Sequence, residues 1–320
     1  MPKHAQAKPD IARRAAKDQE KGTALDAFNL EFAKDIAPDR PILIAGATAS
    51  GKSALALALA ERWGGQIINA DALQVYDGWR LLTARPSAAD EDRCPHHLYG
   101  HVPSLGDYSV GAWLRDLAPL LRTGPRPIIV GGTGLYFRAL TEGLAEIPPV
   151  PKAVRIVADG QSHAALLADL EQSDPVIYAK IDRQNRARVQ RAWEVWRATG
   201  KPLSQWQAET PAPLLPLDQV AAFKLMADRD WLNDRIARRF HTMIKEGALD
   251  EARAALPHWD QLQGAAKAIG APELIAHLRG DISLETAIEA AIIASRQYAK
   301  RQRTWLRAQS TGWTDLYIHV

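Results

Sequence analysis

Gly46-Ala47-Thr48-Ala49-Ser50-Gly51-Lys52-Ser53 is the stretch that decides the fold class. It follows a short apolar run at residues 42–45, which predicts a strand, and precedes residues 53–63, whose Ala and Leu content predicts a helix. A G-x-x-x-x-G-K-[ST] motif in this setting is typical of a phosphate-binding loop, because its glycines let successive N–H groups face one anion. The helix N-terminus and Lys52 add positive charge. We predict that residues 46–53 bind phosphate or pyrophosphate and that the Ser53 hydroxyl ligates Mg²⁺.

Other segments alternate between predicted strands and predicted helices. Residues 66–69 form a short strand that ends just before Asp71, and residues 127–130 form another that ends in Gly131-Gly132-Thr133-Gly134. Residues 220–226 read as a buried strand, and residues 315–320 as a last short one. This alternation predicts an α/β fold: a P-loop NTPase-like core with a mostly parallel sheet, plus a helical insertion domain. Ligands of such sheets bind beyond the carboxyl ends of the strands.

The chain divides into an extension, a core and an insertion. Residues 1–40 are rich in Ala, Lys, Arg and Asp with little apolar periodicity, which predicts a poorly ordered N-terminal extension. A more specific alternative is that this extension is a basic arm that contacts RNA. The pattern changes at Ile147-Pro148-Pro149-Val150-Pro151, and helical segments follow without a convincing strand. We assign residues 41–143 and 214–320 to the core with its C-terminal helices, and residues 144–213 to the insertion.

Composition excludes several classes of protein. Cys94 is the only cysteine among 320 residues, which excludes an internal disulfide framework and a cysteine-rich zinc site. No apolar run approaches the roughly 18–20 residues that span a bilayer. The formal charge of +3 is too small to indicate a partner, so local clusters must do so. Because His96, His97 and His101 have no matching carboxylate cluster, we interpret them as structural or surface residues.

Asp71 is the first candidate for chemistry outside the loop. It follows the second predicted strand, where a P-loop hydrolase carries an aspartate for Mg²⁺. Its position at the mouth of the loop equally suits a base that faces the substrate, and it also suits a helix N-cap. The residue types around Asp71 leave these three roles open.

Eight segments occur in order along the chain and together resemble one family. They are Asp71-Ala72-Leu73-Gln74-Val75-Tyr76; Thr83-Ala84-Arg85-Pro86; His96-His97-Leu98; Tyr108-Ser109-Val110; Val130-Gly131-Gly132-Thr133-Gly134-Leu135-Tyr136; Arg191-Ala192-Trp193-Glu194 with Thr199-Gly200-Lys201-Pro202; Lys267-Ala268-Ile269-Gly270; and Arg296-Gln297-Tyr298-Ala299-Lys300-Arg301-Gln302 before Thr304-Trp305. Over roughly residues 41–308 the chain resembles the tRNA dimethylallyltransferase family, also called tRNA isopentenyltransferase.

Some positions depart from the family's usual pattern. Ala72 stands where Ser is usual, Leu82 where Gly is usual, and Arg85 where Lys is usual. Ala271-Pro272 replaces a common pair of an aromatic and a basic residue. These departures concern substrate contacts rather than the chemistry.

The resemblance implies a reaction and its catalytic residues. The family joins the dimethylallyl group of dimethylallyl pyrophosphate to N6 of the adenine that is 3′-adjacent to the anticodon, and pyrophosphate leaves. The loop at residues 46–53 would then hold the leaving group with Mg²⁺. Asp71 matches the family's general base, and Thr48 and Arg239 match residues that touch phosphate; Arg235 and Arg238, on the same predicted basic helix, are better interpreted as solvated. This assignment makes Asp71, Thr48 and Arg239 the candidate catalytic residues.

The resemblance also implies contacts with tRNA. The matching positions are Asp71, Ala72, Leu73, Gln74, Thr133, Ala187, Arg188, Val189, Gln190, Arg191 and Lys267. Residues 180–201 and 295–307 each have a net charge of +5, which suits phosphate contacts, and the first stretch lies in the insertion. We expect the insertion to hold the anticodon stem and the target base to be flipped out. Trp193, Trp196 and Trp206 have spacings that favour helix packing over base stacking.

Three alternatives share part of this pattern. Transfer onto free AMP or ADP needs the loop and Asp71 but neither the insertion nor the basic stretches. A P-loop small-molecule kinase needs an arginine-rich lid, and a non-enzymatic RNA-binding protein does not need Lys52, Ser53 and Asp71 together. The resemblance favours a cytoplasmic, monomeric enzyme with tRNA and dimethylallyl pyrophosphate as partners and without a membrane association.

Overall fold

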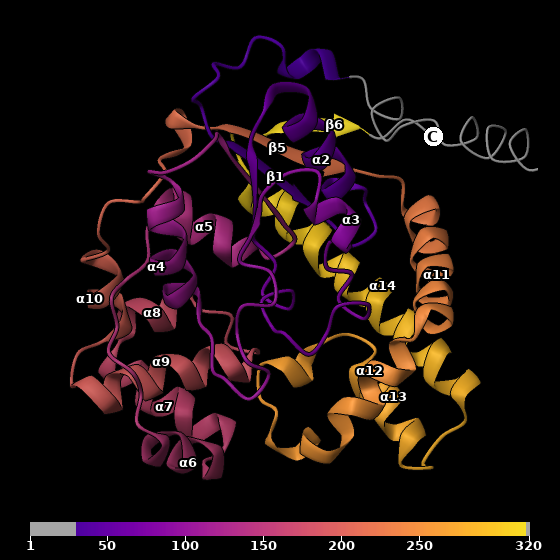
Figure 1. The fold of residues 1–320 in the computed structure, drawn as a ribbon. Helices are drawn as coiled ribbons and strands as arrows, with labels where there is room; N and C mark the ends of the chain where they lie inside the picture. The colour runs from indigo at the N-terminus through magenta and orange to yellow at the C-terminus, as the bar shows by residue number, and fades with distance from the viewer. Residues whose placement is uncertain (1–29, 318–320) are drawn as a thin grey trace, which may run out of the picture. The chain divides into compact units, whose positions relative to one another are not determined.

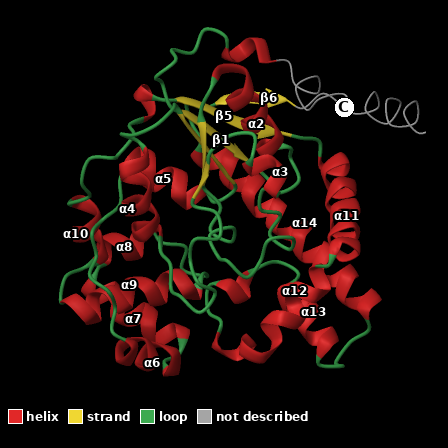
Figure 2. Ribbon diagram, in the orientation of Figure 1, coloured by secondary structure: helices red, strands yellow, loops and turns green. Residues whose placement is uncertain are grey.

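The computed structural model describes residues 30–317, which divide into two compact units (Figures 1 and 2). The first unit holds the residues up to Phe137 and from Leu217 onward, and the second is Arg138–Pro216. The chain enters the second unit within a helix, α5 (Gly134–Glu142), and leaves it just before the short helix η2 (Leu217–Gln219).

The first unit is built on one parallel sheet. Its strands are β1 (Ile42–Gly46), β2 (Gln66–Asn69), β3 (His96–His97), β4 (Pro127–Gly131), β5 (Ala221–Met226) and β6 (Thr314–Tyr317), in the order β3-β2-β4-β1-β5-β6. Every residue of β1, β2 and β4 is buried, as expected for parallel strands covered on both faces. The five strands predicted from the sequence are confirmed within the described residues, and so is the α/β class; residues 318–320 of the last predicted strand lie outside the described residues. Strand β3 was not predicted, because a two-residue strand has no periodicity and exists only by pairing with Ile67 and Ile68.

Helix α2 (Lys52–Trp63) follows β1 and covers the sheet. Leu55 and Leu59 pack with Ile42 and Ile44 of β1 and with Ile128 of β4 in one apolar cluster. Helices α3 (Ala88–Glu91) and α4 (Val110–Leu120) precede β3 and β4. This strand–loop–helix unit brings residues 46–52 to the carboxyl end of the central strand, where a ligand site is expected.

Residues 30–40 belong to the packed core, which corrects the predicted extent of the extension. Phe32, in the short helix η1 (Leu30–Ala33), meets Phe223 of β5 edge-on at 4.8 Å between ring centroids. The Arg40 guanidinium donates to the carbonyls of Asp218 and Val220 at 3.0 and 2.9 Å. These contacts pair residues almost 180 positions apart, so local sequence could not reveal them. Residues 1–29, with the predicted basic arm, lie outside the described residues.

The C-terminal helices form a second apolar cluster of the first unit. They are α11 (Arg229–Glu246), α12 (Ala248–Ala255), η3 (Leu256–Gln261), η4 (Ala265–Lys267), α13 (Ala271–Leu278) and α14 (Leu284–Gln309). Phe240, Leu274 and Ala291 pack here against Trp79, whose indole N–H donates to the carbonyl of Ala265 at 2.9 Å. Figure 1 shows α14 running from this cluster to the sheet, where it contacts β1.

The second unit, described in full, contains helices and no strand. Besides the end of α5 it contains α6 (Lys152–Gly160), α7 (His163–Ser173), α8 (Pro175–Lys180), α9 (Arg186–Thr199) and α10 (Leu203–Ala208). Trp193 is 1% exposed in its core and donates to Asp169 at 2.8 Å, while Trp196 packs at the edge of this core. Asp174 caps α8 through the N–H of Ile177 and also accepts from the N–H of Ser204, which ties α8 to α10. Core packing of Trp193 and Trp196 agrees with the prediction from their spacing, whereas Trp206 is half-buried outside this cluster and donates to Thr199 Oγ1 at 3.2 Å.

Candidate active site

The loop between β1 and α2 has the geometry of an anion cradle. Gly51 caps α2 at φ 90° and supplies no side chain to the free N–H groups of the first turn. Ala49 also has positive φ, 62°, a conformation that is uncommon for a residue with a side chain. A Cβ on Gly46 would lie 2.6 Å from Ser50 Oγ, so the tight turn requires glycine there. The loop therefore presents backbone donors and a helix N-terminus to one point.

A cationic pocket of about 990 Å³ opens over this loop. Gly51, Lys52 and Ser53 line it from the loop, and Arg235, Arg238 and Arg239 line it from α11. No acidic side chain is among its lining residues, all of which are described. Four cations around one cradle suit a ligand with several negative charges, as pyrophosphate has. This pocket is called the phosphate pocket below.

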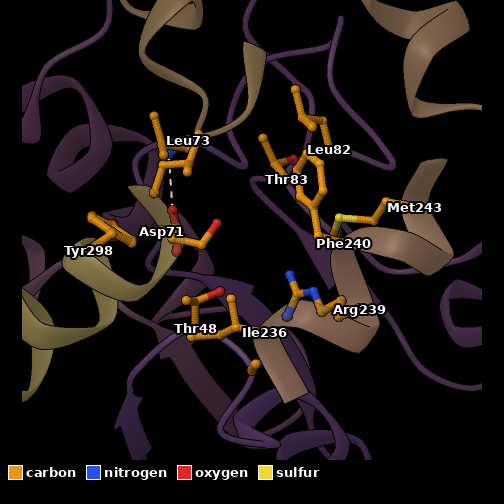
Figure 3. A pocket seen from close by; sticks show the side chains of 13 residues that line it. Thr48, Asp71, Leu73, Leu82, Thr83, Ile236, Arg239, Phe240, Met243 and Tyr298 are labelled. Atoms are coloured by element: carbon orange, nitrogen blue, oxygen red, sulfur yellow. Dashed lines mark hydrogen bonds between the residues drawn. The ribbon is translucent and has the colours of Figure 1, made fainter. Parts of the chain in front are cut away.

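A second pocket of about 550 Å³, partly open to solvent, adjoins the first (Figure 3). Thr48, Asp71, Thr83 and Tyr298 contribute polar groups to it. Its apolar wall consists of Leu73, Leu82, Ile236, Phe240, Met243 and Ile269. Ala49 and Arg239 line both pockets, so a ligand with an anionic end and an apolar end can occupy the two together. This second pocket is called the transfer pocket below.

Asp71 faces the transfer pocket at the end of β2. Its side chain is only 9% exposed, and Oδ1 accepts from the N–H of Leu73 at 3.0 Å (Figure 3). No helix begins there, since residues 72–75 form a turn, so the predicted N-cap role is wrong. Asn69 orients this turn, because its Oδ1 accepts from the N–H of Asp71 at 2.8 Å. One carboxylate oxygen is thus held in place while the pocket receives the other.

Lys52 carries a perturbed charge in this site. Burial lowers the pKa of Lys52 to about 8, while attraction by Asp71 raises it and repulsion by Arg239 lowers it. Burial likewise lowers the pKa of Arg239 to about 10, with Asp71 opposing the shift. Both cations remain mostly charged at pH 7, although burial penalises the charge of each. An anion bound between them would relieve that penalty, which is what a preformed anion site requires.

Tyr298 and Gln302, on α14, are site residues that the sequence reasoning missed. The carboxamide of Gln302 accepts from the N–H of Thr48 at 2.8 Å and donates to the carbonyl of Gly132 at 3.1 Å. The Tyr298 hydroxyl lies beside the side chains of Gln302 and Thr133. The signal was in the motif quoted above, because positions 298 and 302 lie on one face of a helix.

Arg235 is exposed, as the sequence interpretation held, yet it also contacts the phosphate loop. Its Nε donates to the carbonyl of Ala49 at 3.0 Å, and its guanidinium lies over the ring of Trp231 at 4.6 Å. The contact with Ala49 supports the loop at its strained residue. Arg238 is exposed, as expected, yet it also lines the phosphate pocket.

The candidate tRNA residues of the first unit have mixed placements. Leu73 lines the transfer pocket. Gln74 turns its amide group inward, donating to the carbonyls of Thr83 and Ala84 at 2.9 and 2.8 Å. Thr133 accepts from the N–H of Ala72 at 2.9 Å, which fixes the residue next to Asp71. Lys267 is exposed on η4.

The remaining candidates lie on α9 of the second unit. Ala187, Arg188 and Arg191 are exposed, and Gln190 donates to Asp159 and Glu194 at 2.7 and 3.0 Å. Val189 is 0% exposed in the core of this unit, so its side chain cannot contact RNA, and that assignment is corrected. A basic stretch on an amphipathic helix includes some positions that face the core. Counting charges along the sequence does not distinguish these positions from the exposed ones.

A carboxylate fixes the loop that carries Leu82 and Thr83. Glu251 of α12 accepts from three successive N–H groups, those of Arg80, Leu81 and Leu82, at 2.9, 2.7 and 3.0 Å. Successive N–H groups that converge form a nest for an anion, and here the protein supplies that anion itself. Glu251 therefore sets the position of one wall of the transfer pocket.

We expect Glu251→Ala to lower the free energy of unfolding by about 2 kcal/mol, because charge-assisted hydrogen bonds of this kind contribute about 1.5–3 kcal/mol. Urea denaturation measures this change. Glu246→Ala, which removes an exposed carboxylate at the end of α11, is the matched control and should leave stability within about 0.5 kcal/mol. Equal effects of the two substitutions would contradict the anchoring role of Glu251.

Metal ligation by the histidines has no support among residues 30–317. No group of three or more His, Cys, Asp and Glu side chains in that range could hold a metal ion. His96 Nδ1 lies 2.9 Å from the carbonyl oxygen of Cys94, and His101 Nε2 lies 3.1 Å from the Tyr108 hydroxyl. In the same range, no helix combines the length and the apolar character that crossing a bilayer requires.

Comparison with known proteins identifies the family. A family model described as IPP transferase matches residues 74–309, and one described as isopentenyl transferase matches residues 40–93. A tRNA dimethylallyltransferase of Jannaschia sp. (strain CCS1) is 61% identical over 282 residues, which cover 88% of this chain and 97% of that protein. This chain belongs to the tRNA dimethylallyltransferase family.

Solved structures of tRNA dimethylallyltransferases share the fold. The full-length tRNA isopentenylpyrophosphate transferase of Bacillus halodurans is 31% identical, with a TM-score of 0.63 over 88% of this chain and 90% of that one. A eukaryotic dimethylallyltransferase captured acting on tRNA is 26% identical, with a TM-score of 0.74 over 87% of this chain and 73% of that one. The resemblance seen in the sequence and the P-loop-like α/β class are both confirmed.

The departures from the usual dimethylallyltransferase pattern have structural roles here. Leu82 is 5% exposed in the wall of the transfer pocket. The Arg85 guanidinium packs so closely on Gly100 that a Cβ there would lie 2.1 Å away, and it donates to the carbonyl of Tyr76 at 3.3 Å. Ala271-Pro272 opens α13, where proline suits the first turn.

Proposed function

We propose that this dimethylallyltransferase moves the dimethylallyl group of dimethylallyl pyrophosphate to N6 of the adenine 3′-adjacent to the anticodon in tRNA. One observation carries the proposal: the cationic phosphate pocket and the Asp71-lined transfer pocket adjoin, and Arg239 lines both. A pyrophosphate in the first pocket places its allyl group in the second. Asp71 and the apolar wall then face the carbon that reacts.

The donor side of the reaction separates charge, and the site is built to receive it. As the allylic C–O bond breaks, negative charge grows on the leaving pyrophosphate. The free N–H groups at the start of α2, together with the side chains of Lys52 and Arg239, stabilise that charge. Ile236 and Phe240 provide apolar surface for the dimethylallyl group.

The acceptor side needs a base and an orientation. The N6 lone pair forms the new C–N bond while the electron pair of the C–O bond leaves with pyrophosphate. The N6 proton passes to the carboxylate of Asp71, which is held by the N–H of Leu73. The exocyclic amine is a weak nucleophile, so holding it in line with the C–O bond contributes as much as proton removal.

The site suits Mg²⁺ by the chemistry of its donors. The Ser53 hydroxyl lines the phosphate pocket beside Lys52, and Mg²⁺ needs only one or two protein oxygens when phosphate and water complete its shell. We propose Ser53 as its protein ligand. When bound, Mg²⁺ would neutralise charge on the leaving pyrophosphate.

tRNA binding, in this proposal, uses the exposed cations of the two basic stretches. Arg188 and Arg191 of α9 and Arg296, Lys300 and Arg301 of α14 are exposed. Arg186 is excluded from that set, because it donates to the carbonyls of Ala158 and Gln161 at 3.2 and 2.8 Å. The target adenine must leave its stack to reach Asp71. We further propose a monomer that acts in the cytoplasm, where its tRNA substrate is found.

The test is transfer of radiolabel from dimethylallyl pyrophosphate, with Mg²⁺, to unmodified tRNA, with AMP and ADP assayed in parallel. We expect label in the adenine beside the anticodon. Label in AMP or ADP but not in tRNA would replace the proposed acceptor with a free nucleotide. Consumption of ATP without any transfer would point instead to a kinase.

The perturbed pKa of Lys52 predicts a pH dependence of donor binding. Lys52 is charged below pH 8 and neutral above it, and a bound pyrophosphate favours the charged form. We expect the affinity for dimethylallyl pyrophosphate to fall about tenfold between pH 7 and pH 9, because the free protein must then take up a proton. Calorimetric titration measures this change. Lys52→Met should bind weakly with no such step, and a flat profile for the unaltered protein would refute the prediction.

A further inference from the structure

A hydrogen-bonded chain crosses the site from the donor loop to the base. Gln302 Oε1 accepts from the N–H of Thr48 in the loop after β1, and Gln302 Nε2 donates to the carbonyl of Gly132 after β4. Thr133, the residue after Gly132, accepts through Oγ1 from the N–H of Ala72 beside Asp71, and the Tyr298 hydroxyl lies beside the side chains of Gln302 and Thr133. The ends of three strands are thus linked through two side chains of α14.

The Gln302 side chain is buried, and the backbone packs closely around it. Gln302 is 6% exposed, and a Cβ on Gly132 would lie 2.0 Å from its Nε2, so a side chain at position 132 would displace the carboxamide. A Cβ on Gly131 would lie 2.0 Å from the carbonyl oxygen of Ala70, which brings β4 equally close to the residue before Asp71. Fitted packing of this kind leaves the loops little freedom to shift independently.

These hydrogen bonds also occupy backbone groups that could otherwise bind a substrate. The N–H of Thr48 is one of the donors of the phosphate loop, yet it is directed to Gln302 at 2.8 Å rather than to the anion. Both polar ends of the carboxamide are occupied by backbone groups, so this amide is arranged to hold two loops. Tyr298, in contrast, lines the transfer pocket near Asp71 (Figure 3).

We propose that Gln302, with Tyr298, is a positioning residue that keeps Asp71 in register with the donor loop, so that the acceptor amine and the allylic carbon meet in line. The inference rests on the proposed transfer reaction. It predicts that loss of the carboxamide slows the chemical step while the phosphate pocket, which Gln302 does not line, still binds the donor. A purely structural residue would lower stability and binding together.

The variant that tests this is Gln302→Met, which keeps the side-chain length and removes both hydrogen bonds. Gln297→Ala is the matched control, since Gln297 is an exposed glutamine on the same helix. We expect Gln302→Met to lower kcat for transfer to tRNA about 30-fold or more, as small misplacements of reacting groups do, and to leave the dissociation constant of dimethylallyl pyrophosphate within about threefold. A kcat within about threefold of the unaltered enzyme, or equal losses in kcat and donor affinity, would overturn the proposal.

Hydrogen exchange supplies a readout that needs no activity. In Gln302→Met the amides of residues 46–51 and 131–133 should exchange faster together, whereas Gln297→Ala should change neither segment. Unchanged exchange in both segments would overturn the inference even if the enzyme proved to act on another acceptor. If Gln302→Met does not fold, Tyr298→Phe and Thr133→Val are made instead, singly and together. We expect the double variant to lower kcat by less than the product of the two single reductions. A multiplicative result would mean that the two side chains do not act as one chain of contacts.

Discussion

Asp71→Asn is expected to lower kcat for dimethylallyl transfer by about 10²–10⁴-fold, the usual contribution of a positioned general base. The carboxamide keeps an oxygen that can accept from the N–H of Leu73, so the turn at residues 71–74 should persist. What the variant loses is the negative charge and the ability to take the N6 proton. The label-transfer assay with tRNA measures the effect, and circular dichroism verifies that the fold is retained.

Two controls separate the base from its electrostatic influence. Asp92→Asn removes an exposed carboxylate outside both pockets and should leave kcat within about twofold. Asp71 also raises the pKa of Lys52, so in Asp71→Asn that pKa should fall below about 8 and donor binding should weaken from a lower pH. Assays at pH 6.5, where protonation of Lys52 is more favoured in both proteins than at pH 8, reduce this effect and expose the loss of the base. Retention of most activity at that pH would show that Asp71 is not the proton acceptor.

Arg239→Ala is the second substitution expected to have a large effect, with kcat reduced about 10²–10³-fold. Arg239 lines both pockets, so its charge lies where the C–O bond breaks. Its pKa of about 10, lowered chiefly by burial, keeps it charged at pH 7. The attraction between Arg239 and the pyrophosphate grows as negative charge develops on the leaving group. The substitution should therefore destabilise the transition state more than the bound donor, and the loss should fall on kcat.

Arg238→Ala provides the contrast, because Arg238 is exposed and lines the phosphate pocket alone. We expect it to raise KM for the donor a few-fold and to leave kcat nearly unchanged, as removal of uniform binding does. Arg239→Lys should not restore activity, since an ammonium lacks the planar fork of the guanidinium. Similar kinetics for the Arg238 and Arg239 variants would contradict a special role for Arg239.

The placement of the phosphate loop could be predicted because all its determinants are local. Glycines at positions 46 and 51, Lys52 and Ser53 lie within eight residues, between an apolar strand and an Ala- and Leu-rich helix. Asp71 and Thr133 could be named as candidates for a related reason: each lies two residues beyond the end of a buried strand of the parallel sheet, and such strand ends meet at one edge. Motif order then distinguished the family from other P-loop proteins.

Other parts of the site depend on contacts between distant residues. Gln302 meets Thr48 across 254 positions, Arg235 meets Ala49 across 186, and Glu251 meets Leu82 across 169. Their local sequence is compatible with an ordinary solvated helix, so these contacts could not be predicted from it. The assignment of Val189 to tRNA binding was wrong because Val189 faces the core, although arginines on the same turn of α9 are exposed.

The sequence by itself determined the family, the phosphate loop and the candidate base Asp71, because these depend on residue type, short-range spacing and the order of motifs along the chain. Only the tertiary structure decided how those groups are held. Every residue except proline has the same backbone N–H and carbonyl groups, so residue type does not show which of them binds a distant side chain. Tertiary packing decides that Thr48, Leu82 and Ala49 do so. Candidate reactive groups could therefore be named from the sequence, whereas the contacts that hold them could not.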